Sequence, residues 1–197
     1  MKHLLYIDCT MRPDSRTALL ADAFLDALDP KKYQITTLDL DAMDLEPLRN
    51  EAFRTRQLLL AKPDRNHPRF QLAKQFAAAD VIVIAAPYWD MSFPSLLKVY
   101  IEQVCIDGVT FKSTADGLSG LCKAEKLIYL TTRGGLVETD SAADQASSYF
   151  KALQTMLGYK DFACIAASGM DIAGYDWQSS LNAAIREAKK TAIGLAV

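Results

Sequence analysis

The feature that most constrains the fold of this chain is an alternation of strand-like and helix-like hydrophobic patterns from one end to the other. Short apolar or alternating runs predict five strands, at residues 3–9, 33–40, 81–86, 126–132 and 162–168. The run at 81–86 (VIVIAA) is continuously apolar, which is typical of a strand covered on both faces. Strands that alternate with helices build βαβ units, so we expect an α/β fold with a parallel sheet.

Helical spacing of apolar residues predicts three helices, over residues 15–29, 95–105 and from 177 to the end of the chain. Pro30 is expected to end the first of them. An eight-stranded barrel needs about 250 residues, whereas this chain has 197. We therefore expect an open, five-stranded parallel sheet inside a three-layer sandwich.

The alternating pattern breaks at residues 46–70, which are polar and contain three prolines. We interpret this segment as an insertion, partly helical over residues 50–62, within a single domain of residues 1–197. It carries six basic residues: Arg49, Arg54, Arg56, Lys62, Arg65 and Arg69. These side chains could meet the phosphate of a dinucleotide, although such a run is more often a solvated face.

Composition and charge exclude several classes of protein. A net charge of −2 lacks the basic excess that binding to nucleic acid requires. No uncharged run approaches the roughly 20 residues of a membrane-spanning helix. The start of the chain has no signal-peptide pattern, so we expect a cytoplasmic protein.

The four cysteines are not spaced as metal ligands, and only two histidines exist to help, so no metal site is expected. We expect these cysteines to be reduced and mostly buried. Cys9 is the one that falls near a candidate site, because it follows the first strand.

In an open parallel sheet, ligands bind beyond the carboxyl ends of the strands, where the strand order reverses. After the first strand, hydroxyl and basic side chains precede a helix: Thr10, Arg12, Ser15, Arg16 and Thr17. Free N–H groups and the helix dipole make a helix N-terminus suited to phosphate. Capping alone explains one hydroxyl but not the cluster. The loop is neither a P-loop nor a dinucleotide fingerprint.

Two further loops follow predicted strands. The first is unusually apolar for a loop and contains Pro87, Tyr88, Trp89, Asp90 and Met91. It is interpreted as a wall for a flat aromatic ligand, or else as a loop folded on the core or at a subunit interface. The second contains Thr132, Arg133, Gly134 and Gly135. Its glycine pair permits close backbone approach to a ligand, although for that pair taken alone a simple turn is the better explanation. Together, an anion site, an aromatic wall and a close-approach loop predict a pocket for flavin mononucleotide (FMN).

The strings AAPYWDMSFPSLLK, GVTFK and TTRGG resemble the FMN-dependent NADH-azoreductase family of flavodoxin-like quinone reductases, in the same order along essentially the whole chain. The resemblance implies a flavodoxin-like sheet with strand order 2-1-3-4-5 and a homodimer with both active sites at the interface. It implies reduction of quinones or azo compounds by NADH or NADPH through FMN. By the same resemblance, Thr10, Ser15, Arg16 and Thr17 hold the phosphate, residues 87–91 line the ring, and residues 132–135 meet its far edge.

The sequence departs from this family at three positions. Asp90 stands where many members have Asn, Val137 where many have His, and Ser113 where a Tyr is frequent. Val137 removes one stabiliser of charge on the reduced flavin, and Ser113 leaves the substrate side more open. These departures affect the expected substrate preference more than the expected cofactor.

The function that we expect is two-electron hydride transfer in which the cofactor carries the chemistry at its nitrogen N5, and no side chain acts as catalytic acid or base. A flavin reductase that releases its product is an alternative of the same class. An electron-carrying flavodoxin is another alternative, but such carriers are usually more acidic than a chain of charge −2. A flavin-free binding module is the third.

Overall fold

The computed structural model describes residues 1–195. Its centre is a five-stranded, all-parallel sheet with the order β2-β1-β3-β6-β7. The strands are β1 (Lys2–Asp8), β2 (Tyr33–Asp39), β3 (Val81–Ala85), β6 (Lys126–Thr132) and β7 (Phe162–Ala167). Counted within the sheet alone, this order is 2-1-3-4-5, so the predicted fold class and topology are confirmed.

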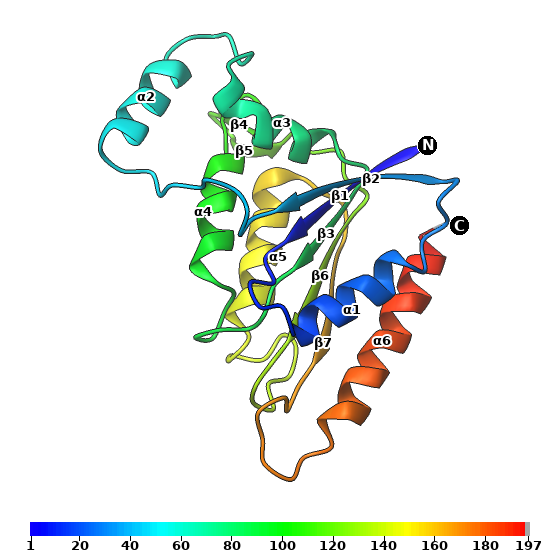
Figure 1. The fold of residues 1–197 in the computed structure, drawn as a ribbon. Helices are drawn as coiled ribbons and strands as arrows, with labels where there is room; N and C mark the ends of the chain where they lie inside the picture. The colour runs from blue at the N-terminus through cyan, green and yellow to red at the C-terminus, as the bar shows by residue number, and fades with distance from the viewer. Residues whose placement is uncertain (196–197) are drawn as a thin grey trace.

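Helices cover both faces of the sheet (Figure 1). On one face lie α1 (Arg16–Leu25) and α6 (Trp177–Gly194), and on the other lie α3 (Gln71–Ala78), α4 (Ser95–Val104) and α5 (Gln145–Leu157). Successive residues of a strand pack alternately against the two helical layers, because side chains alternate across a strand. In β1, Leu4 and Tyr6 pack against α1 and α6, whereas Leu5 and Ile7 pack on the opposite side. Such a strand needs apolar residues at every position, which explains its continuous run.

The first predicted helix ends earlier than expected, and the last is present. The prediction that Pro30 ends the first helix is wrong, because α1 ends at Leu25 and tight turns carry the chain on to the next strand. There the N–H of Ala27 donates to the carbonyl of Phe24, a contact three residues apart that closes the helix. The predicted final helix is present over Trp177–Gly194, and its last positions, 196 and 197, lie outside the described residues.

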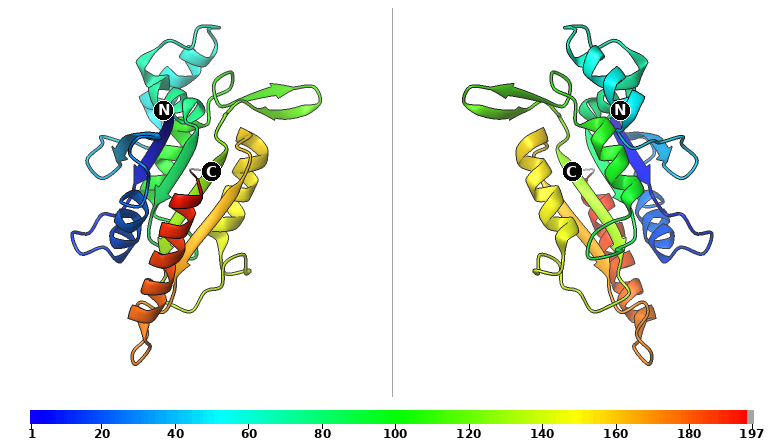
Figure 2. Two further views of the ribbon diagram at one scale, coloured as in Figure 1. Left: turned by 90° about the vertical axis from the view of Figure 1, so that its right-hand side faces the viewer. Right: turned by 90° about the vertical axis from the view of Figure 1, so that its left-hand side faces the viewer.

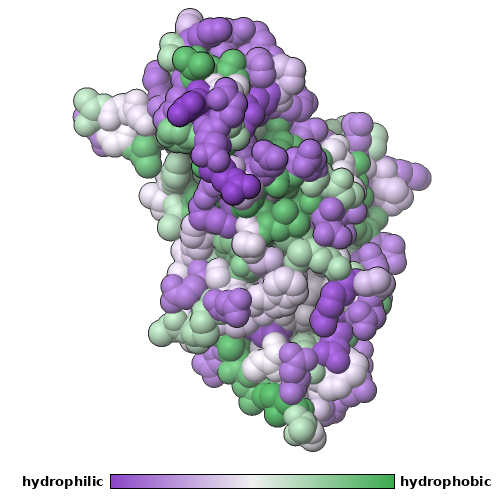
Figure 3. Space-filling view, turned by 60° about the vertical axis from the view of Figure 1, so that its left-hand side comes forward, coloured by the Kyte–Doolittle hydropathy of each residue, from purple (hydrophilic) through white to green (hydrophobic). Residues whose placement is uncertain are grey.

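The insertion contains α2 (Asn50–Leu60) and a short 3-10 helix, η1 (Pro68–Phe70). No residue of α2 is buried, and the helix stands away from the sheet. The insertion is anchored instead by Phe70, which packs with Ala73 and Ile106 in a small separate core. Figure 3 shows that the surface of this upper part of the molecule is mostly hydrophilic.

A hairpin of β4 (Phe111–Thr114) and β5 (Gly117–Gly120) projects from the body, as Figure 2 shows. The sequence analysis placed no element here, nor at α3 or α5. The base of the hairpin touches the end of α5 at two glycines. A Cβ on Gly120 would lie 2.3 Å from the backbone nitrogen of Gly158, which itself ends α5 in the left-handed conformation (φ 88°). Only glycine allows this backbone contact.

Candidate functional site

Loops that follow four strands meet at the carboxyl edge of the sheet around one hollow. Its lining residues are Arg12, Arg16, Pro87, Tyr88, Trp89, Thr132, Gly134, Met170 and Asp171. The hollow encloses only ≈ 50 Å³, so a ligand of the size of FMN would lie across its mouth rather than inside it. The three loops singled out in the sequence are thus brought together. The contribution of Met170 and Asp171 was missed, because the loop after the fifth strand carries no motif, although its place at the same edge was available as a signal.

The loop after β1 combines a helix cap with donors that have no partner. Ser15 Oγ accepts a hydrogen bond from the N–H of Ala18 at 3.2 Å, so Ser15 does cap α1. Its hydroxyl proton is not used by that bond. The N–H groups of Arg16 and Thr17 open the helix and therefore have no acceptor within it. Capping and anion binding are compatible here, since the cap uses the oxygen of Ser15 and an anion would use the proton.

The other two hydroxyls of this loop are already engaged. Thr10 donates to Oδ1 of Asp8 through both its N–H (2.9 Å) and its hydroxyl (2.7 Å). Thr17 is buried, and its hydroxyl lies 2.6 Å from that of Thr132, which joins α1 to the end of β6. The assignment of these residues to a phosphate stays a prediction, and the geometry gives Ser15 the larger share of it.

The Arg16 side chain turns toward the loop after β7. Its Nη1 donates to the carbonyl of Met170 at 3.0 Å and lies 3.4 Å from Oδ1 of Asp171, and its guanidinium stacks 4.4 Å from the centre of the Trp177 ring. These contacts engage the side chain, so the backbone N–H is the group of Arg16 that remains free at the helix N-terminus. Arg12, which the sequence analysis did not assign to the cofactor, is exposed and lines the hollow.

The aromatic loop after β3 forms a two-residue turn with a strained backbone. The N–H groups of Trp89 and Ser92 each donate to the other's carbonyl at 2.9 Å, and between them Asp90 (φ 49°) and Met91 (φ 70°) are left-handed. Non-glycine residues in this region cost roughly 1–3 kcal/mol each and are held by their surroundings. The turn leaves Trp89 43% and Met91 50% exposed at the edge of the hollow. Tyr88 anchors the loop by donating its hydroxyl to the carbonyl of Ala143 at 2.5 Å.

Arg133 forms a buried ion pair beneath this loop. Its Nη2 lies 2.8 Å from Oδ2 of Asp144, with the two side chains 1% and 0% exposed. Its Nη1 donates to the carbonyl of Val137 at 2.8 Å, and its guanidinium lies 5.7 Å from the centre of the Tyr88 ring. The side chain therefore ties loop 134–144 to the aromatic loop. The backbone N–H of Arg133 donates to the carbonyl of Ala167 at 2.8 Å, and its carbonyl accepts from the N–H of Met170 at 3.0 Å, so neither the side chain nor the N–H is free for a cofactor.

Burial of Asp144 pushes its pKa upward, but hydrogen bonds from Ser147 and Asp140 and the charge of Arg133 outweigh that effect. The pKa of Asp144 accordingly lies below its ordinary value. Asp144 also caps α5 by accepting from the N–H of Ser147 at 3.0 Å. One carboxylate thus fixes both the helix start and the guanidinium.

The two glycines after Arg133 differ in their surroundings. A Cβ on Gly134 would lie 2.5 Å from Oδ2 of Asp171, so this position is closed by the loop after β7. A Cβ on Gly135 would meet nothing within 4 Å. Packing within the chain therefore does not require glycine at position 135, and its contact with a ligand stays a prediction.

Of the three departures from the family, Asp90 lies in the strained turn, whereas Val137 and Ser113 do not line the hollow of their own chain.

The cysteines are all free, and Cys9 is buried. Burial, aided by the charge of Asp8, raises the pKa of the Cys9 thiol to about 12, so this thiol stays protonated and is not a nucleophile. Within residues 1–195, no group of three or more His, Cys, Asp or Glu side chains is placed to hold a metal ion. No helix in the described part of the chain has the length and apolar character to cross a membrane.

Comparison with known proteins extends over nearly the whole chain. A family model described as flavodoxin-like fold matches residues 2–192. The chain is 34% identical to an FMN-dependent NADH:quinone oxidoreductase 2 of Clostridium acetobutylicum and 36% identical to an FMN-dependent NADH:quinone oxidoreductase of Clostridium beijerinckii, with 98% of each chain covered. Among solved structures, an FMN-dependent NADH-azoreductase from Bacillus anthracis in complex with FMN shares the fold, with a TM-score of 0.86, 21% identity and full coverage of both chains. The resemblance stated from the motifs is confirmed, and the chain belongs to the flavodoxin-like fold family that includes these FMN-dependent NADH:quinone oxidoreductases.

Proposed function

We propose that this protein is an FMN-dependent oxidoreductase that transfers two electrons from NADH or NADPH to a quinone or an azo compound. The observation that carries the proposal is the meeting of four strand-end loops around one hollow, with free helix N–H groups on one side and an exposed aromatic wall on the other. The full-length relatives are named as NADH:quinone oxidoreductases, which favours NADH as the donor and a quinone as the acceptor.

The residues present fit FMN. Ser15 and the N–H groups of Arg16 and Thr17 would hold its phosphate, Trp89 and Met91 would cover its ring, and the backbone at Gly135 would meet the polar edge. When bound, FMN supplies an acceptor and donor of hydride.

The chain's own residues bind and orient, and none is assigned as acid or base. Tyr88 is the phenol that lines the hollow, but burial raises its pKa and its hydroxyl donates a hydrogen bond to the carbonyl of Ala143, so it stays neutral.

Steady-state kinetics test this function. The carboxyl edge of the sheet has one hollow with one aromatic wall, and the sequence has no dinucleotide fingerprint that would give the donor a site of its own. We therefore expect the donor to leave before the acceptor enters. We expect parallel double-reciprocal lines when NADH and a soluble benzoquinone are varied together. Intersecting lines, with product inhibition that indicates a ternary complex, would contradict the shared site. A purified protein that is colourless and takes up no flavin would leave only the binding-module alternative.

We also propose that the protein is a homodimer. Trp89, Met91 and Leu136 are exposed together at the carboxyl edge, and monomeric proteins rarely expose such an apolar patch without a function. Apolar surface is visible at the lower end of Figure 3, where the loops after β6 and β7 lie. The hairpin projects away from its own hollow, so Ser113 can approach a substrate only in a partner subunit. A twofold dimer is the commonest arrangement that covers such surfaces reciprocally.

Analytical ultracentrifugation measures the assembly directly. At micromolar concentrations, the FMN-loaded protein is expected to sediment at twice the mass of the 21.8 kDa chain. Trp89→Asp, which places a charge in the apolar patch, is expected to shift the protein toward monomer, while Lys190→Asp on the exposed face of α6 is not. Sedimentation of the unaltered protein as a monomer throughout this range would refute the dimer.

Domain organisation, cellular location and partners are proposed from the sequence. We propose one domain over residues 1–197, acting in the cytoplasm on small molecules and binding neither nucleic acid nor membrane. The four free cysteines and the net charge of −2 support this setting.

A further inference from the structure

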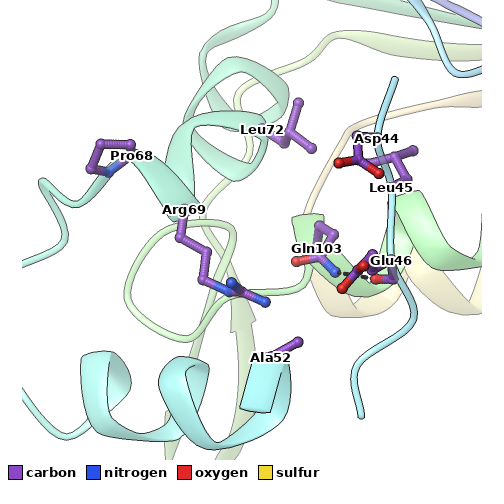
Figure 4. A pocket seen from close by; sticks show the side chains of 8 residues that line it. All are labelled: Asp44, Leu45, Glu46, Ala52, Pro68, Arg69, Leu72 and Gln103. Atoms are coloured by element: carbon purple, nitrogen blue, oxygen red, sulfur yellow. Dashed lines mark hydrogen bonds between the residues drawn. The ribbon is translucent and has the colours of Figure 1, made fainter. Parts of the chain in front are cut away.

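A second cavity lies between the insertion and helices α3 and α4, and it shares no residue with the hollow at the sheet edge. It encloses ≈ 450 Å³ and is lined by Asp44, Leu45, Glu46, Ala52, Pro68, Arg69, Leu72 and Gln103 (Figure 4). Gln103 is eight residues beyond the start of α4, which places it about 12 Å along the helix from the aromatic loop. The cavity is thus a separate site, outside contact distance of that loop.

Arg69 is the cationic side chain of this cavity. Figure 4 shows its side chain extending from η1 into the cavity, toward Ala52 and Gln103. Its Nε is buried and has no hydrogen-bond partner. No carboxylate of residues 1–195 lies within ion-pair distance of its guanidinium. A guanidinium with a buried, unused donor is unsatisfied in the protein alone.

A second arginine of the insertion, Arg56, lies outside the lining of the cavity. Arg56, on α2, donates from Nη2 to the carbonyl of Cys105 at 2.7 Å, and its Nε is also buried without a partner. Burial lowers the pKa of Arg56; Cys105 and Glu102 oppose this effect, and the positive charge of Arg69 adds to it. Arg56 does not line the cavity, so its charge adds to the field there from outside the lining, and Arg69 is the guanidinium that a bound anion would contact.

The other wall of the cavity carries acceptors. Asp44 and Glu46 are exposed carboxylates, and Gln103 donates to the backbone carbonyl of Glu46 at 3.2 Å. Carboxylates accept hydrogen bonds from hydroxyl groups and repel a bare anion. A ligand that satisfies both walls carries an anion at one end and hydroxyl groups at the other.

We propose that this cavity binds the phosphate group of a phosphorylated sugar, with Arg69 as the donor to the phosphate, and Asp44 and Glu46 as acceptors for the sugar hydroxyls. Guanidinium groups match phosphate geometry with paired donors, which is why arginine is favoured at such sites. The site lies beyond the proposed redox function and does not depend on it.

Isothermal titration calorimetry on the FMN-loaded protein tests the proposal with three probes: ribose 5-phosphate, ribose and inorganic phosphate. Ribose 5-phosphate is expected to bind and ribose is not. Arg69→Gln is expected to weaken ribose 5-phosphate by about tenfold or more, the value of one charge-assisted hydrogen bond. Arg54→Gln is the matched control, because Arg54 is an exposed arginine of α2 that does not line the cavity, and it is expected to change nothing. Arg69→Lys, which keeps the charge, is expected to restore part of the affinity.

The probes also distinguish the source of the phosphate. Equal binding of inorganic phosphate and ribose 5-phosphate, both lost in Arg69→Gln, supports the site with free phosphate as its ligand. Equal affinities in Arg69→Gln and the unaltered protein, binding of ribose as tight as that of ribose 5-phosphate, or no heat with any probe at millimolar concentration would each overturn the proposal.

Discussion

Replacing Asp144 by alanine is expected to lower the free energy of unfolding by about 3–5 kcal/mol, because it leaves a buried guanidinium without its partner. Arg133 is 1% exposed, and the Asp144 carboxylate lies 2.8 Å from its Nη2. The same substitution removes the cap of α5. Urea unfolding followed by circular dichroism measures the loss.

Two controls separate this ion pair from an ordinary one. Glu125→Ala breaks the exposed pair between Lys160 and Glu125, which are 67% and 54% exposed, and should cost less than about 1 kcal/mol. The double variant Arg133→Met/Asp144→Ala removes both buried charges and should recover much of the stability lost by Asp144→Ala alone. A loss in Asp144→Ala no larger than that in Glu125→Ala would mean that the pair is not stabilising.

The pH dependence of this stability has a definite sign. Because the pKa of Asp144 is lower in the folded protein than its ordinary value, the contribution of this carboxylate is fully present above about pH 4. It is lost as the pH falls through the lowered, folded-state value. The unaltered protein should therefore lose more stability on acidification than Asp144→Ala does.

The sheet and the position of the hollow could be predicted because the topology of a parallel sheet brings the loops after its strands to one edge. Once five apolar runs alternate with helices, the carboxyl ends of the strands share one edge, and residues as distant in the chain as Arg16 and Gly134 line one hollow. The loop after β7 lies at that edge too, and Met170 and Asp171 were missed only because no motif draws attention to them.

Side-chain direction could not be predicted in the same way. Arg133 stands in the TTRGG string beside two glycines, yet it points beneath the aromatic loop to Asp144, eleven residues on. Thr17 stands beside Ser15, yet its hydroxyl is bonded to Thr132 from another strand. Both contacts join segments that only the folded chain brings together, and no spacing in the sequence encodes them.

The hairpin and α5 were missed for different reasons. The strands Phe111–Thr114 and Gly117–Gly120 have four residues each and lie outside the core, so they lack the alternation that marks a half-buried strand. In α5, Phe150, Leu153 and Leu157 are buried at helical spacing between a cap at Asp144 and a terminating Gly158. That signal was present in the sequence and was not used.

Removing the Ser15 hydroxyl is expected to weaken FMN by about 10- to 100-fold while leaving riboflavin, which lacks the phosphate, nearly unchanged. The reason is that the cap uses only the Ser15 oxygen and leaves its proton for a charge-assisted bond to a phosphate at the helix N-terminus. Thr17→Val should have a smaller effect on FMN, because the Thr17 hydroxyl is buried against that of Thr132. Fluorescence titration of the apoprotein measures both ligands.

A pair of substitutions at Ser15 separates phosphate binding from helix capping. Ser15→Ala loses both the hydroxyl and the cap, which costs about 1 kcal/mol of stability. Ser15→Gly loses the hydroxyl but lowers the stability by only a few tenths of that amount, because glycine is also favoured at the N-cap. If the hydroxyl binds phosphate, both variants lose the same factor in FMN affinity, and only Ser15→Ala loses stability in urea. If Ser15 is a cap alone, FMN and riboflavin weaken together in Ser15→Ala and neither weakens in Ser15→Gly, because the helix end is then disturbed in the first variant only. That second pattern would show that the anion at this helix is held by backbone N–H groups and by the neighbouring Arg12, without the serine.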